Sequence, residues 1–577
     1  GDRLVHGVKG KVPNLATRAV VLPATQVVNI NKATLTLGQQ LDTKMYDGVL
    51  LNVDVGTGIG LINFTKLFRV KSNLGSFVNM IEEMTGKTKV NNKVRTTIVV
   101  DNLHVGGAAS FDAQGADVVV VEGDFLSQDK ETLALTGGVR AERLELQKVL
   151  KVQLGNNKTS AKQFFTSAGS GKLTLKLNDA EADLPALNLQ SLSMTGGSLK
   201  TPSLKVADSM TLNGGLIETQ EFGTKGSLTV VSAGHLKSAG AVVAPGGIKV
   251  DQKSTVDGTE FTTNQGVEVL GQSALKGTSM KAGGGLTVTD STYETSGASG
   301  FGGDVKITSS TVKSGAFKGQ VYTQSGNKSD VTLGATDLKS FSASDGKTTL
   351  ASLKTSGDGV QSDGNKLTIS NENMDIAGGW LMKKMTVLTI DKGWDQGHGV
   401  YRLMINAKSF VVDSQAHVDL SGKGYPIGVW HYAISEMQPG LKEGGCHAGF
   451  GGATSPKCVP YDDFRAPMWP GLAGVAGYST AGAGGGVLHL FVTNGIAVNG
   501  TISANGMTGF GGGAGGSILL KGRSLQGNGV VSANGGVAHA WSKYSDSKAS
   551  YHGGGGGGMV AFVDFEVMAE KFKPESI

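Results

Sequence analysis

Cysteine, proline and aromatic residues are all scarce in this chain of 577 residues, which has 2 Cys, 12 Pro and 6% aromatic residues. Two cysteines exclude a disulfide-rich scaffold, in which cysteine exceeds about 8% of the residues. The low proline content, without a Gly-X-Y period, excludes a collagen triple helix. A hydrophobic content of 39% is low for a thick globular core, but it suits the thin interior of a repeat protein.

Long apolar runs and blocks of like charge are also missing. The longest apolar runs, such as Val118–Val121, are far shorter than the roughly 18 residues that a membrane-spanning helix needs. The net charge of +5 is spread along the chain without basic blocks. We therefore expect no membrane span, and nucleic acid is disfavoured as a partner.

Glycine is abundant, with 89 residues, and short strands recur at a nearly fixed interval. A first series of apolar–polar–apolar strands begins at Leu228, Ile248, Val267, Leu286 and Val305. A second series is marked by Leu236, Val256, Leu275, Tyr293 and Val312. The steps are 20, 19, 19 and 19 residues in the first series and 20, 19, 18 and 19 in the second. A repeat of this length with two or three short strands predicts a β-solenoid, whose coils are stable only when stacked.

The predicted fold is therefore all-β, a right-handed parallel β-helix with glycine-rich C-terminal coils and side loops. We divide it into an N-terminal cap or irregular β region (1–96), a regular β-helix (97–378) and a glycine-rich section with loops (379–577). A short helix is expected at Phe77–Met84, because Ser76 suits its N-cap and Gly86 its end. Glycine pairs such as Gly196-Gly197 are expected at the corners of coils.

The C-terminal third contains its own repeat. The block Asn499–Gly506 recurs as Asn528–Gly535, 29 residues later, and glycine runs precede several apolar strands. Asn505 and Asn534 occupy the same place in the two blocks, so their side-chain amides are expected to pair between stacked coils.

Several glycine-rich segments carry a resemblance to a known family. They are Ser421–Tyr425, Gly484–Val487, Val498–Gly506, Gly512–Ile518 and Gly553–Gly558. In order and content they resemble the glycine-rich repeat β-helix proteins found on the extracellular surface of unicellular eukaryotes, over about residues 395–565. The resemblance implies an extracellular location and no known catalysis, and it supplies no functional residues. The polar, aromatic insert at Ala538–Tyr551 departs from the pattern.

The two cysteines, Cys446 and Cys458, lie in one irregular segment. We expect them to form a disulfide, which contributes about 3 kcal/mol by closing a loop. Two free thiols, or a zinc site that also uses His447, remain alternatives, although the spacing matches no common zinc pattern. Four sequons mark possible N-glycosylation, at Asn63, Asn157, Asn327 and Asn499.

Parallel β-helices also include polysaccharide-cleaving enzymes, so we examined this chain for their carboxylates. Gln396–Gly399 followed by Arg402 is similar to part of a polygalacturonase signature. The remaining carboxylates are missing, since the only Asp-Asp pair, Asp462-Asp463, lies downstream in a loop. We predict neither an enzyme nor a cofactor, and a histidine at a corner of a coil is the favoured interpretation of His398.

Aromatic residues gather in the irregular segment 425–480. They are Tyr432, Tyr461, Phe464, Trp469 and Tyr478. This cluster is either a docking patch or a loop that packs its own aromatic side chains. The resulting hypothesis is an extracellular structural protein that self-assembles into a surface filament, sheath or flagellar hair. Its partners would be itself and other surface proteins. The main alternative is an adhesin that binds glycans or another cell surface through the 425–480 loops.

Overall fold

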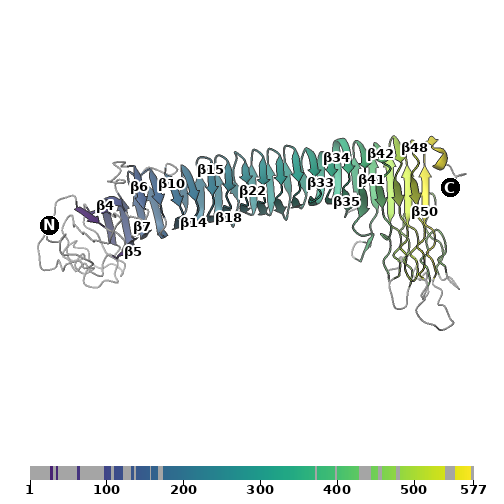
Figure 1. Ribbon diagram of the computed structural model, residues 1–577, viewed down its shortest axis with the longest axis horizontal. Coiled ribbons are helices and arrows are strands. Elements are labelled where there is room, and N and C mark those ends of the chain that lie inside the picture. Colours follow the sequence, from purple (N-terminus) through teal and green to yellow (C-terminus); the bar gives the residue numbers. More distant parts are fainter. Residues whose placement is uncertain are drawn as a thin grey trace, which may run out of the picture. The chain divides into compact units, whose positions relative to one another are not determined.

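In the computed structural model the chain divides into two compact units, Gly1–Gly283 (unit 1) and Gly284–Ile577 (unit 2), each described here by itself. The structure describes residues 26–29, 34–36, 61–64, 96–104, 110–120, 131–135, 138–155, 158–166, 173–370, 373–396, 399–427, 443–452, 458–475, 481–539 and 553–572. Figure 1 shows the strands of each unit stacked as successive coils, with parallel pairing between neighbouring coils.

Most strands of unit 1 form three rows, one strand of each row per coil. The first row contains β6 (Thr132–Leu135), β8 (Lys151–Leu154), β10 (Thr174–Asn178), β13 (Ser191–Thr195), β15 (Met210–Asn213), β17 (Leu228–Val231), β20 (Ile248–Val250) and β23 (Val267–Leu270). The second contains β9 (Lys158–Thr166), β11 (Glu181–Asp183), β14 (Ser198–Val206), β16 (Leu216–Thr224), β18 (His235–Ser238), β21 (Thr255–Asp257) and β24 (Ala274–Gly277). The third contains β12 (Leu187–Leu189), β19 (Val242–Val243), β22 (Glu260–Thr263), β25 (Ser279–Ala282) and the second halves of β14 and β16.

The N-terminal strands of unit 1 pair differently. They are β1 (Gln26–Asn29), β2 (Thr34–Thr36), β3 (Leu61–Phe64), β4 (Thr96–His104), β5 (Ser110–Val120) and β7 (Gly138–Leu146). Here β3 runs antiparallel to both β1 and β4, whereas β4 and β5 are parallel. The predicted helix at Phe77–Met84 lies outside the described residues.

Unit 2 repeats the order of three strands per coil. Its first row contains β26 (Leu286–Thr289), β29 (Val305–Thr308), β32 (Val321–Ser325), β37 (Gly379–Lys383), β42 (Ser409–Val412), β45 (Gly495–Val498), β48 (Ser524–Gln526) and β51 (Val567–Met568). The second contains β27 (Thr292–Thr295), β30 (Thr311–Ser314), β35 (Lys366–Ile369), β38 (Val387–Ile390), β43 (His417–Asp419), β46 (Thr501–Ser503) and β49 (Val530–Ser532). The third contains β28 (Ser299–Phe301), β31 (Phe317–Lys318), β36 (Asn373–Ile376), β41 (Leu403–Ala407), β44 (Val487–Val492), β47 (Ser517–Lys521) and β50 (Met559–Val563).

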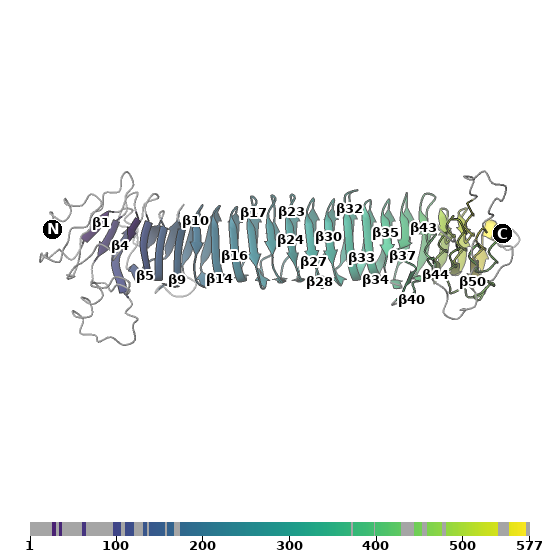
Figure 2. The same cartoon turned by 90° about the horizontal axis from the view of Figure 1, so that it is seen from below.

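Four further strands and one helix complete unit 2. β33 (Asp330–Ser344) and β34 (Lys347–Asp363) run through all three rows, and β39 (Trp394–Asp395) pairs antiparallel with β40 (Gly399–Val400). The 3-10 helix η2 (Glu570–Phe572) is the only helix among the described residues. In Figure 2 the coils of each unit are seen from below. Within the described part of the chain, no helix is long and apolar enough to cross a membrane.

The inward side chains explain why these short strands stack. Both predicted strand series are found, and inward residues such as Val230, Leu236, Val256 and Val312 have no exposed surface. Side chains alternate in and out along a strand, so each coil buries only a few apolar residues, and these pack against the coils before and after. The all-β solenoid predicted from the repeat is confirmed, while its right-handed sense and the domain boundaries at 96/97 and 378/379 stay predictions.

Glycine occupies some corners of the coils, while other corners carry non-glycine residues with positive φ, such as Ser232 and Lys253. Gly196 and Gly197 have φ angles of +67° and +69°, in the left-handed region that favours a residue without Cβ. The asparagine corner differs from the expectation in detail. The backbone N–H of Asn534, rather than its side-chain amide, donates to Oδ1 of Asn505 at 2.7 Å. This hydrogen bond links the two coils at the corner. The side chain of Asn505 accepts it, whereas Asn534 contributes its backbone N–H.

Candidate functional site

The last described coil of unit 2 is paired with the coil before it. Its three strands each pair with the preceding coil: β49 with β46, β50 with β47, and β51 with β48. Among the described residues no strand pairs with their other side.

Apolar side chains become exposed at this last coil. Ile518 and Leu520 of β47 are fully buried, whereas Val560, which pairs with Ile518, is 36% exposed. Phe562, which pairs with Leu520, is only half-buried. The interior of the solenoid therefore opens towards solvent here.

A pocket of about 920 Å³ lies at this open end, and we call it the terminal pocket. Its lining includes Phe464, Arg465, Val530, Val560, Phe562 and Lys571. The helix η2 covers part of the pocket, since its Phe572 is buried and the ring of Phe572 lies 6.3 Å from that of Phe562. Phe464 is 70% exposed and comes from a distant part of the chain, the segment 458–475.

Two anchors fix this segment. The first is a disulfide between Cys446 and Cys458, whose Cα atoms are 6.0 Å apart. Both sulfur atoms are therefore used, and the described residues contain no group of three side chains that could hold a metal ion. The zinc alternative that combined the cysteines with His447 is not formed in this structure.

The second anchor is the carboxylate of Asp462, whose side chain is only 2% exposed. It accepts hydrogen bonds from the backbone N–H of Trp469 (2.7 Å) and Met468 (2.8 Å). The hydroxyl of Ser517 on β47 (3.1 Å) and Nε2 of His447 (3.2 Å) also reach it. The burial of Asp462 would raise its pKa, but the hydrogen bonds from His447, Trp469, Met468 and its own neighbour lower the pKa below the ordinary value. The ionised carboxylate thus ties the segment to the coils.

The trio Ser517, His447 and Asp462 contains the residue types of a catalytic triad but not its geometry. In a triad, the serine and the carboxylate contact different ring nitrogens of the histidine. Here Ser517 and Asp462 both face Nε2, at 3.4 and 3.2 Å, and Nδ1 faces the carbonyl of Gly515 at 2.8 Å. Ser517 and His447 have no exposed surface. The trio is a structural network, which the sequence did not indicate because Ser517 lies 55 residues after Asp462 and 70 residues after His447.

The predicted aromatic cluster is partly described. The hydroxyl of Tyr461 donates to the carbonyl of Pro470 at 2.5 Å, and its ring lies 4.9 Å from His447. The guanidinium of Arg402 lies 5.2 Å from the ring of Trp469. Tyr461 and Trp469 therefore pack the segment, while Phe464 alone of the described three faces the terminal pocket. Tyr432 and Tyr478 lie outside the described residues.

The other predicted sites are placed as follows. Asn327 and Asn499 are exposed and lie between strands, and Asn63 lies in β3. Asn157 and His398 lie outside the described residues. Arg402, the other member of the polygalacturonase-like motif, donates from Nε to the carbonyl of Met468 at 2.9 Å, so it supports the same segment.

The glycine runs of unit 2 form a bundle that the sequence did not predict. The N–H of Gly512 donates to the carbonyl of Gly553 at 3.0 Å, and three residues later Gly515 donates to Gly556 at 2.9 Å. A spacing of three is typical of extended chains with three residues per turn, which have no internal hydrogen bonds. In Figure 1 these runs, light green to yellow, extend away from the coils of β41 and β50.

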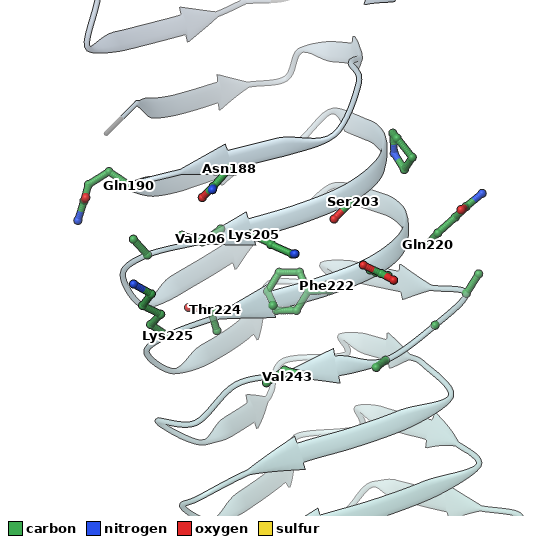
Figure 3. Close-up of a pocket in the computed structure, with 17 residues that line it drawn as sticks. Asn188, Gln190, Ser203, Lys205, Val206, Gln220, Phe222, Thr224, Lys225 and Val243 are labelled. Carbon is green, nitrogen blue, oxygen red and sulfur yellow. The ribbon is translucent and has the colours of Figure 1, made fainter. Parts of the chain in front are cut away.

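A larger hollow, of about 1200 Å³, lies on the third row of unit 1. Figure 3 shows Asn188 on β12, Lys205 on β14 and Val243 on β19, with β16 between the last two strands. The three residues occupy the same outward register position. At this position β16 has Gly223, and a Cβ added there would meet nothing within 4 Å. Its lining mixes polar side chains such as Lys205 and Glu221 with apolar ones such as Phe222, and we assign it no chemistry.

The comparisons with known proteins give no further guide to this site. No protein-family model, no curated protein and no solved structure matches the chain.

Proposed function

We propose that this protein is an extracellular structural protein that self-assembles into a surface filament, sheath or flagellar hair. The observation that carries the proposal is the stack of parallel coils, in which each coil packs its apolar residues against the coils before and after it. Repeat proteins of this kind present extended surfaces to their partners.

The proposed mechanism is mechanical. Hydrogen-bonded coils resist bending and stretching because parallel pairing joins neighbouring coils along the three rows. The side loops would supply the contacts between subunits and with other surface proteins.

The extracellular location rests on three supporting features. The disulfide between Cys446 and Cys458 is typical of an oxidising compartment. The sequons at Asn327 and Asn499 are exposed, as glycan acceptors must be. The resemblance to glycine-rich surface proteins of unicellular eukaryotes points the same way.

Sedimentation velocity over a range of protein concentrations, followed by negative-stain microscopy, tests the proposal. We expect large, concentration-dependent particles with a regular repeat. A protein that stays monomeric at all concentrations, and is found as isolated particles in native material, would contradict self-assembly.

A second candidate, an adhesin, is favoured by one observation. The segments around the disulfide expose Phe450 (56%), Phe464 (70%) and Met468 (46%), which is unusual for large apolar side chains. Glycan-array binding by isolated particles, lost on replacing Phe450 and Phe464 by serine, would support adhesion in place of assembly.

A further inference from the structure

A column of charged side chains follows the second row of unit 1, with one residue on each of six successive strands. These residues share one outward register position, because each is paired with the next in the parallel ladders. The charge column, as we call it, contains Asp183 on β11, Lys200 on β14, Glu218 on β16, Lys237 on β18, Asp257 on β21 and Lys276 on β24. The sign of the charge changes at every step along the column.

Most of this charge is turned towards solvent. The alternation keeps like charges from meeting on neighbouring strands, which would destabilise the stack. Among the described residues one ion pair joins two members of the column, with Nζ of Lys237 3.2 Å from the carboxylate of Glu218. Asp183, Lys200 and Lys276 are exposed, and within the same part of the chain they form no ion pair. Their charges are therefore available to a second surface.

The charge column borders a hollow of about 700 Å³ on unit 1. All six charged residues line this hollow, together with small residues at the corner of the coils, such as Ala239, Gly258 and Gly277. Beside the column, Nε2 of His235 lies 2.7 Å from the carboxylate of Asp257 and holds it in place. The hollow gives long side chains of a second surface room to lie against the column.

The order of the signs makes the charge column complementary to itself. Consider a second copy related by a twofold axis that is parallel to the strands and passes between β16 and β18. Every carboxylate of one column then faces an amine of the other, in the pairs Asp183 with Lys276, Lys200 with Asp257, and Glu218 with Lys237. The match extends along the column, because neighbouring strands are about 4.8 Å apart in both copies. A twofold axis along the column would instead bring like charges together.

We propose that the charge column binds the charge column of a second copy of this chain in antiparallel orientation. The contact is additional to the side loops, and it rests on the proposed function because it names one surface through which subunits associate. Each pair occurs twice across the axis, as in other twofold interfaces. Complementary charges fix the register of the two copies. Because exposed ion pairs are individually weak and screened by salt, the dimer should dissociate as the salt concentration rises.

Carbodiimide coupling of carboxylates to amines tests the orientation in the unmodified chain. Within one copy β14, β16, β18 and β21 separate Asp183 from Lys276, a distance of about 24 Å at about 4.8 Å per strand, so a direct cross-link joins two copies. We expect mass spectrometry to detect this cross-link at low salt, and at least about tenfold less of it in about 0.5 M sodium chloride. Absence of the cross-link at low salt would overturn the proposal.

A charge exchange across the axis makes the test specific. Glu218 faces Lys237 in the dimer, so Glu218→Lys or Lys237→Glu alone brings like charges together twice. We expect either variant to dimerise at least about tenfold more weakly in sedimentation velocity, and an equal mixture of the two variants to recover the wild-type affinity. Glu260→Lys is the matched control, since Glu260 is exposed on β22 outside the column. Unchanged melting temperatures confirm the fold, and a mixture that dimerises no better than its components would contradict the twofold pairing.

The result is separable from that of the proposed function. If the chain forms dimers with the cross-link between Asp183 and Lys276 but no larger particles at any concentration, then the contact stands and the filament fails. If large regular particles form without this cross-link, and form equally from Glu218→Lys, then assembly uses other surfaces and the proposal for the charge column is wrong.

Discussion

At the scale of single residues, the carboxylate of Asp462 holds the segment in which the predicted aromatic residues lie. The sequence indicated the segment around Tyr461, Phe464 and Trp469 and the pairing of its cysteines. It did not indicate Asp462 as the centre. Met468 and Trp469 are only six and seven residues away, but His447 and Ser517 lie in other parts of the chain, and only the fold brings them to the carboxylate.

Replacing Asp462 by asparagine should release the segment. The amide loses the negative charge that accepts from Met468 N–H, Trp469 N–H and His447, so we expect a loss of about 2–3 kcal/mol of local stability. Hydrogen exchange at Met468 and Trp469 should accelerate correspondingly. Asp463→Asn is the matched control, since that residue is exposed, and equal acceleration in both variants would contradict the role of Asp462.

The lowered pKa of Asp462 also predicts a dependence on acid. In an unfolded chain the pKa of this carboxyl is about 4, and in the folded protein its pKa is lower. The ionised form therefore stabilises the fold at every pH above about 4. This stabilisation should be lost as the pH falls through the folded pKa. The difference in melting temperature between the wild type and Asp462→Asn should be constant from pH 7 to 5 and shrink below about 4. A difference that persists at pH 2 would show that the charge is unimportant.

At the scale of elements, strands were predictable and the glycine bundle was not. In the first two rows the strands alternate buried and outward residues, as in Leu228–Val231, and this alternation recurs from coil to coil. The third row was harder because several of its strands are very short, such as Val242–Val243. The glycine runs have no side-chain period at all. Their order lies in backbone hydrogen bonds at every third residue, which composition alone does not reveal.

The bundle predicts a sharp difference between two glycines of the same section. A Cβ at Gly485 would lie 1.8 Å from the carbonyl oxygen of Ala504, whereas one at Gly557 would meet nothing within 4 Å. Gly485→Ala should therefore force the neighbouring runs apart and cost about 1–3 kcal/mol, while Gly557→Ala should be nearly neutral. Thermal unfolding of both variants measures this. Equal melting temperatures would show that the runs are not packed backbone to backbone.

At the scale of the whole molecule, stability in each unit depends on neighbouring coils. A coil in the middle of a unit is supported on two sides, while the last coil of unit 2 is supported on one side within the described residues. The repeat in the sequence predicted the stacking, but the exposed end was not predictable. Val560 and Phe562 follow the same alternation as the buried residues before them, but no further strand among the described residues covers them.

One pair of substitutions separates the role of a central coil from that of the end. Ile518 and Val560 occupy the same register position, but Ile518 is fully buried and Val560 is 36% exposed. Ile518→Lys buries a charge with coils on both sides, so a loss of more than about 4 kcal/mol is expected. Val560→Lys leaves the lysine room to reach water, so its melting temperature should change little. Thermal unfolding of both variants measures the difference. Equal losses of stability in the two variants would show that Val560 is as deeply buried as Ile518.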